Sequence, residues 1–203
     1  MEKKLNPLEK VYYIFYSSKK QRMYFNEIRE KAKISISSLQ NSLRKLEKSG
    51  EIEKTKERAN VFYNLNDEEA IALNFSKFDI LRLESLNINV KLPIKELIEK
   101  AGNIAFVLLF GSASRGEEKK GSDIDLIIVT HHFVENRLNE AYQKQIKEEI
   151  GEISKTVKAK SLYTLSLVFI DEKEFETRKD YLLDEAKKTG FCVYNQQYYH
   201  KRK

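Results

Sequence analysis

Two aspartates, Asp123 and Asp125, are separated by one residue and follow a glycine-rich stretch that begins at Gly111. Alternate side chains of an extended strand point to the same face, so we expect the two carboxylates to lie side by side. Neighbouring carboxylates repel each other unless a cation neutralises them, and oxygen ligands of this kind favour Mg²⁺ or Mn²⁺. The spacing therefore predicts a divalent metal site that would bridge to substrate phosphates.

The stretch before the aspartates has the composition of a phosphate-binding turn. Gly111, Gly116 and Gly121 fall within eleven residues, although the whole chain has only seven glycines. Gly111 would let the backbone approach a phosphate closely, and Ser112 would offer a hydroxyl. A helix starting here would add free N–H groups, and Arg115 would add a charge-assisted contact. Together these groups are expected to hold a metal–nucleoside triphosphate.

Apolar runs predict the elements that must position these residues. Residues 104–110 are continuously apolar and predict a buried strand, and residues 123–130 predict a second one. The pattern then predicts a long helix over Val134–Thr156, a strand over Ser161–Ile170, a packing helix around Phe175–Leu183 and a final edge strand after Gly190. Cys192 is predicted to be a buried small hydrophobe, and the end from Tyr198 to be a frayed basic tail.

The motif Phe110-Gly111-Ser112, ten further residues, and Asp123-Ile124-Asp125-Leu126 resembles the nucleotidyltransferase superfamily of DNA polymerase beta, and within it the minimal nucleotidyltransferases of archaea and bacteria. The resemblance implies a small mixed β-sheet flanked by helices over residues 93–203. It also implies transfer of a nucleotidyl group from a nucleoside triphosphate to an acceptor hydroxyl, with pyrophosphate leaving. By this resemblance Asp123 and Asp125 are the catalytic ligands of two Mg²⁺ or Mn²⁺ ions. The implied nucleotide-binding residues are Gly111, Ser112, Arg115 and Ser122.

One part of that family's pattern is missing. Active members usually carry a third carboxylate on a later strand, but residues 161–170 contain no acid. Thr164 or Ser166 stands where that carboxylate is expected, and Asp171 comes only at the strand's end. Either Asp171 or another carboxylate substitutes, or the domain binds nucleotide without efficient turnover. Enzymatic activity is therefore an open question at the level of the sequence.

The net charge of +6 is concentrated at the N-terminal end of the chain. Residues 1–65 hold 15 Lys and Arg against 8 Asp and Glu, whereas residues 66–203 hold 22 against 23. Such asymmetry indicates a nucleic-acid or other polyanion partner for the first third, with a solvated lysine-rich surface as the alternative.

Helical patterns after Pro7 and around Phe25–Ala32 precede a third helix that Ser35 would cap and Gly50 would end, followed by a charged hairpin over residues 51–64. This order resembles the winged helix-turn-helix family over residues 1–65. The resemblance implies that DNA is the partner, with the third helix in the major groove and the hairpin against the backbone. The implied nucleic-acid contacts are Ser37, Gln40, Asn41, Arg44, Lys45, Lys54, Lys56 and Arg58. Protein contact or dimerisation is the other use of such a module.

The sequence thus predicts an α/β (α+β) protein with a winged helix-turn-helix domain at residues 1–65, a helical linker at 66–92 and a nucleotidyltransferase fold at 93–203. Within the linker, a helix is expected over residues 67–86 and a break over residues 87–93, before a new helix at Ile94. No apolar run is long enough for a membrane span, and a single cysteine with no apolar leader favours the cytoplasm. The alternative function is that of a DNA-binding transcriptional regulator or an antitoxin-like partner of another protein, whose degenerate nucleotidyltransferase domain only binds nucleotide. A homodimer is compatible with either function.

Overall fold

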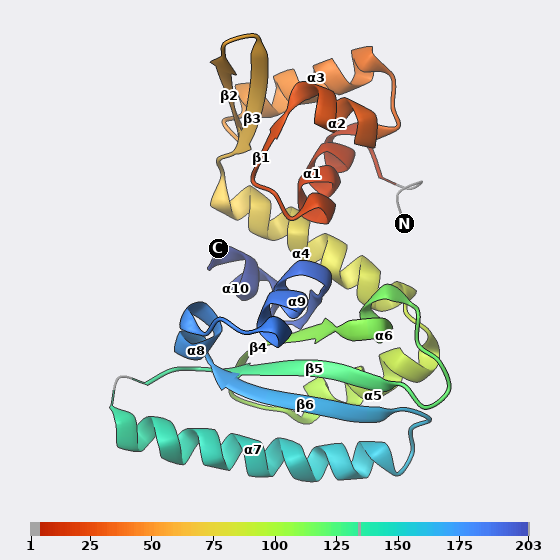
Figure 1. Ribbon diagram of the computed structural model, residues 1–203, viewed down its shortest axis with the longest axis vertical. Coiled ribbons are helices and arrows are strands. Elements are labelled where there is room, and N and C mark those ends of the chain that lie inside the picture. Colours follow the sequence, from red (N-terminus) through yellow and green to blue (C-terminus); the bar gives the residue numbers. More distant parts are fainter. Residues whose placement is uncertain (1–4, 134, 203) are drawn as a thin grey trace. The chain divides into compact units, whose positions relative to one another are not determined.

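The computed structural model describes residues 5–133 and 135–202 and confirms the mixed α/β class. In this part of the chain there are ten helices, a three-stranded antiparallel sheet and a four-stranded mixed sheet (Figure 1). The chain forms two compact units, whose division falls between Leu81 and Arg82. The first unit also takes in the end of the chain from His200.

The first unit runs helix, strand, helix, helix, hairpin. Its elements are α1 (Pro7–Ser18), β1 (Arg22–Tyr24), α2 (Phe25–Ala32), α3 (Ile36–Lys48), β2 (Ile52–Glu57) and β3 (Asn60–Leu65). The short strand β1, which the sequence pattern does not reveal, pairs with β3 and gives the sheet order β1-β3-β2. Three residues carry too little periodicity to mark a strand.

Local capping explains where α1 and α3 begin. Asn6 and Glu9 form a capping box around Pro7, the first residue of α1. The Ser35 hydroxyl accepts a hydrogen bond from the Ser38 backbone N–H at 3.2 Å, as the sequence predicts for α3. Apolar residues of all three helices and of the sheet share one buried cluster. Val11, Phe15, Ile28 and Leu39 are almost completely excluded from solvent there.

Helix α4 (Glu68–Ser85) agrees with the helix expected over residues 67–86. The predicted break after it is wrong, because α5 (Ile88–Lys100) already starts at Ile88 and contains Pro93. The Asn87 side chain accepts a hydrogen bond from the Asn89 N–H at 3.0 Å and so caps α5. Pro93 removes one backbone hydrogen bond near the helix start, but its ring is buried.

The expectation of a frayed C-terminal tail is also wrong. Residues from Gln196 to Lys201 form helix α10, in which Tyr199 and His200 are buried. His200 Nε2 lies 2.6 Å from the Asp79 carboxylate, and the Tyr16 hydroxyl donates to the same carboxylate at 2.5 Å. Asp79 is fully buried, so these polar contacts anchor the chain's end within the first unit.

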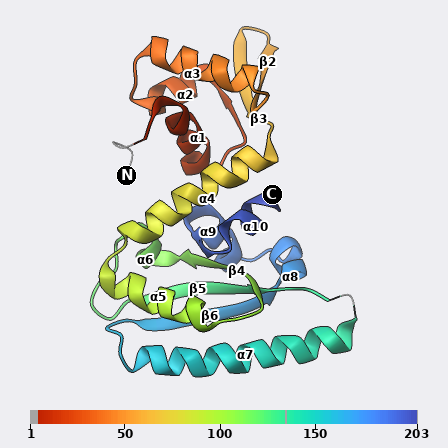
Figure 2. The ribbon, with the colours of Figure 1, turned by 180° about the vertical axis from the view of Figure 1, so that it is seen from behind.

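The second unit contains the four-stranded sheet, in the order β6-β5-β4-β7 (Figures 1 and 2). Its strands are β4 (Ile104–Phe110), β5 (Asp123–Thr130), β6 (Thr164–Asp171) and β7 (Phe191–Tyr194). Strands β4 and β5 have the predicted bounds, and β7 is the predicted edge strand. Strands β5 and β6 are parallel, and the other pairs are antiparallel.

Helices cover both faces of this sheet (Figures 1 and 2). On one face, α5 and α7 (Asn136–Lys158) pack on Ile124, Leu126 and Ile128. On the other face, α8 (Glu172–Thr177) and α9 (Tyr181–Thr189) pack on Ile127 and Val129. Two helices therefore replace the single one expected there, and Cys192 is buried on this face as predicted.

The long helix α7 starts at Asn136, and Val134, the expected first residue, lies outside the described residues. Among the helices that the structure describes, none has the length and apolar character needed to cross a bilayer.

Candidate nucleotide and metal site

The aspartates Asp123 and Asp125 lie at the start of β5, on the same face as Ile127 and Val129. Asp123 is exposed and Asp125 is half-buried. Burial raises the pKa of Asp125; a hydrogen bond from the Ser166 side chain lowers it, and the charge of Asp123 raises it again, leaving it above its usual value. The structure therefore confirms that the two carboxylates share a face, where ionisation of Asp125 is disfavoured.

Gly111 lies beside this pair because Phe110, the last residue of β4, is opposite Asp125 in the antiparallel register. The backbone turns at Gly111 into the short helix α6 (Gly111–Arg115) with a φ of +69°. A Cβ atom at this position would lie 2.4 Å from the Asp125 Oδ2 atom. Only glycine both adopts this φ readily and leaves room for the carboxylate.

The turn that contains Ser112 is fixed by neighbours that the sequence does not single out. The Ser114 hydroxyl donates to the Gly111 carbonyl at 2.8 Å. Arg82, near the C-terminal end of α4, donates to the Ser114 carbonyl at 3.1 Å, and its guanidinium lies 4.1 Å from the centre of the Phe191 ring. Arg82 gives no sequence signal, because its partners are more than thirty residues away.

Two other predicted nucleotide-binding residues have protein partners. The Arg115 guanidinium donates to Glu117 at 2.7 Å and lies 3.6 Å from Glu185. The Ser122 hydroxyl accepts a hydrogen bond from the Lys119 backbone N–H at 2.9 Å and closes the turn before β5. Arg115 would have to exchange its carboxylate partners for a phosphate in order to bind nucleotide.

The parallel pairing of β5 with β6 determines which β6 side chains lie next to the two aspartates of β5. Thr164 is opposite Asp123 and Ser166 is opposite Asp125, so a hydroxyl lies on each side where a third acid is expected. Asp171 is opposite Thr130 at the other end of the strands. Its Cα lies about 16 Å along β6 from that of Ser166, given a rise of about 3.3 Å per residue. Asp171 is therefore not placed to complete a metal site with Asp123 and Asp125.

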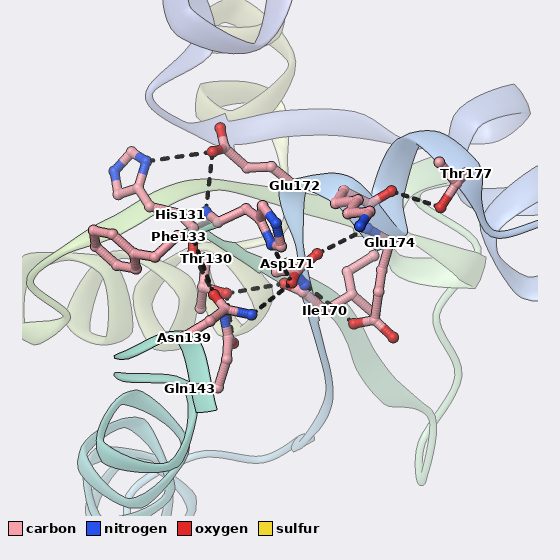
Figure 3. A network of polar contacts seen from close by, with 12 residues as sticks. Thr130, His131, Phe133, Asn139, Gln143, Ile170, Asp171, Glu172, Glu174 and Thr177 are labelled. Carbon is pink, nitrogen blue, oxygen red and sulfur yellow. Dashed lines mark hydrogen bonds and ion pairs between the residues drawn. The ribbon is translucent and has the colours of Figure 1, made fainter. Parts of the chain in front are cut away.

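Asp171 instead belongs to a separate polar network (Figure 3). It accepts hydrogen bonds from the Glu174 backbone N–H at 2.8 Å and from Asn139 at 3.1 Å, and lies 2.8 Å from His132 Nδ1. Burial alone would raise the pKa of Asp171, but these hydrogen bonds bring it below its usual value. His131 and His132 follow the far end of β5 and are not brought to the aspartate pair.

The predicted nucleic-acid contacts are all exposed, and they lie on α3 and the β2–β3 hairpin. Gln40, Arg44 and Lys54 line one groove of 340 Å³, which Tyr24 and Glu47 also border. Lys56 is on the same strand as Lys54, and Arg58 is in the turn of the hairpin. The remaining residues of the predicted set, Ser37, Asn41 and Lys45, lie on α3 outside the residues that line the groove.

The family of polymerase beta nucleotidyltransferases matches residues 93–198, which is more than half of the chain. The matched range includes the turn at Gly111, both aspartates and all four strands of the mixed sheet. The chain belongs to this family. A comparison with curated proteins found no match.

Proposed function

We propose that the second unit binds a metal–nucleoside triphosphate at Gly111, Ser112, Asp123 and Asp125, and transfers a nucleotidyl group to an acceptor hydroxyl. The observation that carries this proposal is the placement of the Asp125 carboxylate against Gly111, with Asp123 on the same face. This placement brings the two aspartates next to the glycine turn that is proposed to bind the phosphates. Membership of the polymerase beta family supports the same reaction class.

The aspartate pair fits a hard divalent cation such as Mg²⁺, or Mn²⁺ in its place. Both ligands are carboxylates, and the ionised form of Asp125 is disfavoured by burial and by the charge of Asp123. When bound, the cation would neutralise this pair and bridge it to triphosphate oxygens. Among the described residues no group of three or more His, Cys, Asp or Glu is arranged to hold a metal, so substrate oxygens and water would complete the coordination.

In the proposed step the acceptor oxygen attacks the α-phosphorus of the triphosphate and forms a new P–O bond. The bond from the α-phosphorus to the bridging oxygen breaks, pyrophosphate leaves with that electron pair, and the hydroxyl proton passes to solvent. Gly111 allows the phosphates to approach the backbone, and the Ser112 hydroxyl orients them. Arg82 acts as a positioning residue, because it holds the α6 turn through the Ser114 carbonyl.

Incubation of the chain with α-³²P-labelled nucleoside triphosphates, Mg²⁺ and candidate acceptors tests the proposal. We expect transfer of label with release of pyrophosphate, and loss of both in Asp123→Asn and Asp125→Asn. Asp184→Asn is the matched control, because Asp184 is an exposed aspartate in the first turn of α9. Activity in the two site variants equal to that of the parent would contradict the assignment of the site.

A second candidate function is nucleotide-dependent regulation without transfer, and the position of Ser166 favours it. A hydroxyl, rather than a carboxylate, faces Asp125 from β6. Saturable nucleoside triphosphate binding without transfer of label or pyrophosphate release would distinguish this function from the first one.

We also propose that the first unit is a winged helix-turn-helix module that binds duplex DNA through α3 and the hairpin. The order of its elements and the exposure of Arg44, Lys45 and Lys54 support this role. Binding to a fluorescent duplex should weaken steeply as salt increases, and weaken further in Arg44→Ala and Lys45→Ala. Binding that is absent or independent of salt would favour a protein partner.

A further inference from the structure

The register between β5 and β6 places a neutral side chain beside Asp125. Ser166 is half-buried and lies directly opposite Asp125 in the parallel ladder, and its side chain lowers the pKa of that carboxyl. Because partners in a ladder point to the same face, the Ser166 side chain shares the face of the aspartates. The same holds for Thr164, which is opposite Asp123. The side chains that β6 contributes to this part of the face are therefore hydroxyls.

The protein ligands of the site are consequently sufficient for one divalent cation. Asp123 and Asp125 are its two carboxylates, and the remaining negative charge comes from the triphosphate. A magnesium ion at a phosphate-transfer site is held by one or two carboxylates together with substrate phosphates and water. The two aspartates provide enough protein carboxylates for one such ion. A second ion would need a further protein carboxylate to share the site.

The other carboxylates on β6 and around the α6 turn have partners of their own, with one exception. Asp171 lies at the far end of β6 and is committed to the α8 capping box, His132 and Asn139. Glu117 and Glu185 are both paired with Arg115. The remaining candidate near the motif is Glu118, whose Oε2 atom is shielded from solvent and has no hydrogen-bond partner among the described residues. The experiment therefore has to show whether Glu118 is a ligand of a second ion.

We propose that this site binds a single divalent ion with the triphosphate, and that Ser166 is the residue that limits it to one. The inference rests on the proposed function of the site, since it concerns the same aspartates and the same nucleotide. The Ser166 hydroxyl stabilises the Asp125 carboxylate and occupies the position from which a third carboxylate would reach a second ion. Replacing this hydroxyl with a carboxylate should create the missing ligand.

The experiment counts Mn²⁺ ions on the full chain. Free Mn²⁺ is measured by electron paramagnetic resonance during titration in the presence of an α,β-methylene nucleoside triphosphate, which cannot react. We expect one Mn²⁺ in the complex of the parent chain with one analogue molecule, and two in the complex of Ser166→Asp. Transfer of label from an ordinary triphosphate should increase at least about tenfold in Ser166→Asp, the scale of a gained or lost supporting ligand.

Ser166→Asn is the matched control, because asparagine has the size of aspartate without its charge. It should bind no more Mn²⁺ than the parent. Three neighbouring carboxylates repel each other, so we expect metal-free Ser166→Asp to melt at a lower temperature than the parent and to recover on addition of Mn²⁺. This recovery is a second readout that does not require turnover.

Two outcomes would overturn the inference. One is a parent protein that already binds two Mn²⁺ ions; if Glu118→Gln then reduces the number to one, Glu118 is the additional ligand. The other is a folded Ser166→Asp variant that still binds only one. Failure of the proposed function is distinguishable from both, because in that case the parent would bind neither Mn²⁺ nor the triphosphate analogue and Asp125→Asn would change nothing.

Discussion

At the scale of single residues, the raised pKa of Asp125 affects both the stability of the metal-free protein and the binding of a metal ion. Its raised pKa, caused first by burial, means that the folded protein holds the Asp125 proton more tightly than the unfolded chain does. The metal-free protein therefore loses stability as pH rises from the usual aspartate value through the raised one. Metal binding has the opposite dependence, because it requires the ionised carboxylate and weakens as pH falls through the same range.

This opposition gives a prediction for Asp125→Asn. We expect a higher melting temperature of the metal-free protein at neutral pH, together with a loss of Mn²⁺ affinity of at least about tenfold. Differential scanning fluorimetry with and without Mn²⁺ measures both effects. Asp184→Asn should change neither, since Asp184 is exposed on α9. A metal-free Asp125→Asn protein that melts below the parent would show that Asp125 has a structural role instead.

Gly111 gives a second prediction at this scale. In Gly111→Ala the added Cβ would meet Asp125 Oδ2 at 2.4 Å, at a φ of +69° that alanine adopts at a cost of roughly 1–2 kcal/mol. We expect a loss of stability of this order from the backbone alone, and loss of nucleotide binding because the carboxylate must move. Denaturant titration and nucleotide binding measure the two effects.

Gly102→Ala is the matched control for this substitution. A Cβ at Gly102 would meet no atom within 4 Å, and its φ lies outside the strained range. It should leave nucleotide binding unchanged. Equal behaviour of the two alanine variants would contradict the close approach between Gly111 and Asp125.

At the scale of elements, we expect the β2–β3 hairpin to contact DNA phosphates and α3 to contact base edges. Lys56 and Arg58 lie toward the turn of the hairpin and are not among the residues that line the groove with Gln40 and Arg44. If they contact phosphates only, Lys56→Ala and Arg58→Ala should each reduce the slope of log K against log salt by roughly 0.9 and weaken all duplex sequences alike. Gln40→Ala should instead change the preference among sequences.

Affinities measured for several duplexes over a range of salt concentrations would separate these effects. Lys31→Ala is the control, because Lys31 is an exposed lysine of α2 outside the predicted contact set. A salt slope that is the same in the parent and in both hairpin variants would exclude the hairpin from phosphate contact.

At the scale of the whole molecule, the residues from His200 onward belong to the same compact unit as residues 1–81. His200 is on α10, yet it belongs to the compact unit of residues up to Leu81 and lies against the buried Asp79 carboxylate of α4. Removing a hydrogen-bond partner of a buried polar group typically costs about 1–3 kcal/mol, and Asp79 would keep only the hydrogen bond from Tyr16 among those described above. His200→Ala should therefore destabilise the N-terminal unit, although it is far from that unit in the sequence.

Hydrogen exchange read by mass spectrometry would localise this effect. In His200→Ala we expect faster exchange in peptides from α1 and from the part of α4 up to Leu81, which includes Asp79, and unchanged protection in β5. Lys201→Ala is the adjacent control, since the ion pair of Lys201 with Glu69 is exposed and contributes at most about 1 kcal/mol. Faster exchange in β5 would show that the loss is not confined to the first unit.

The sequence by itself determined the local parts of this protein. Continuous apolar runs set the bounds of β4 and β5, and Ser35 and Pro7 marked helix starts, because these signals depend only on neighbouring residues. The spacing of Asp123 and Asp125 likewise settled that their side chains share a face. The motif that identifies the family is contained in residues 110–126, so it could be recognised without the fold.

Only the tertiary structure decided which residues from distant segments meet. The parallel register of β5 and β6 put Ser166, and not Asp171, beside Asp125, and no local pattern encodes the register of strands separated by a long helix. Arg82 and His200 owe their roles to contacts more than thirty and more than one hundred residues away. The burial of α10 also reversed the expectation of a frayed tail, since a short polar segment gains its order from the partners that it packs against.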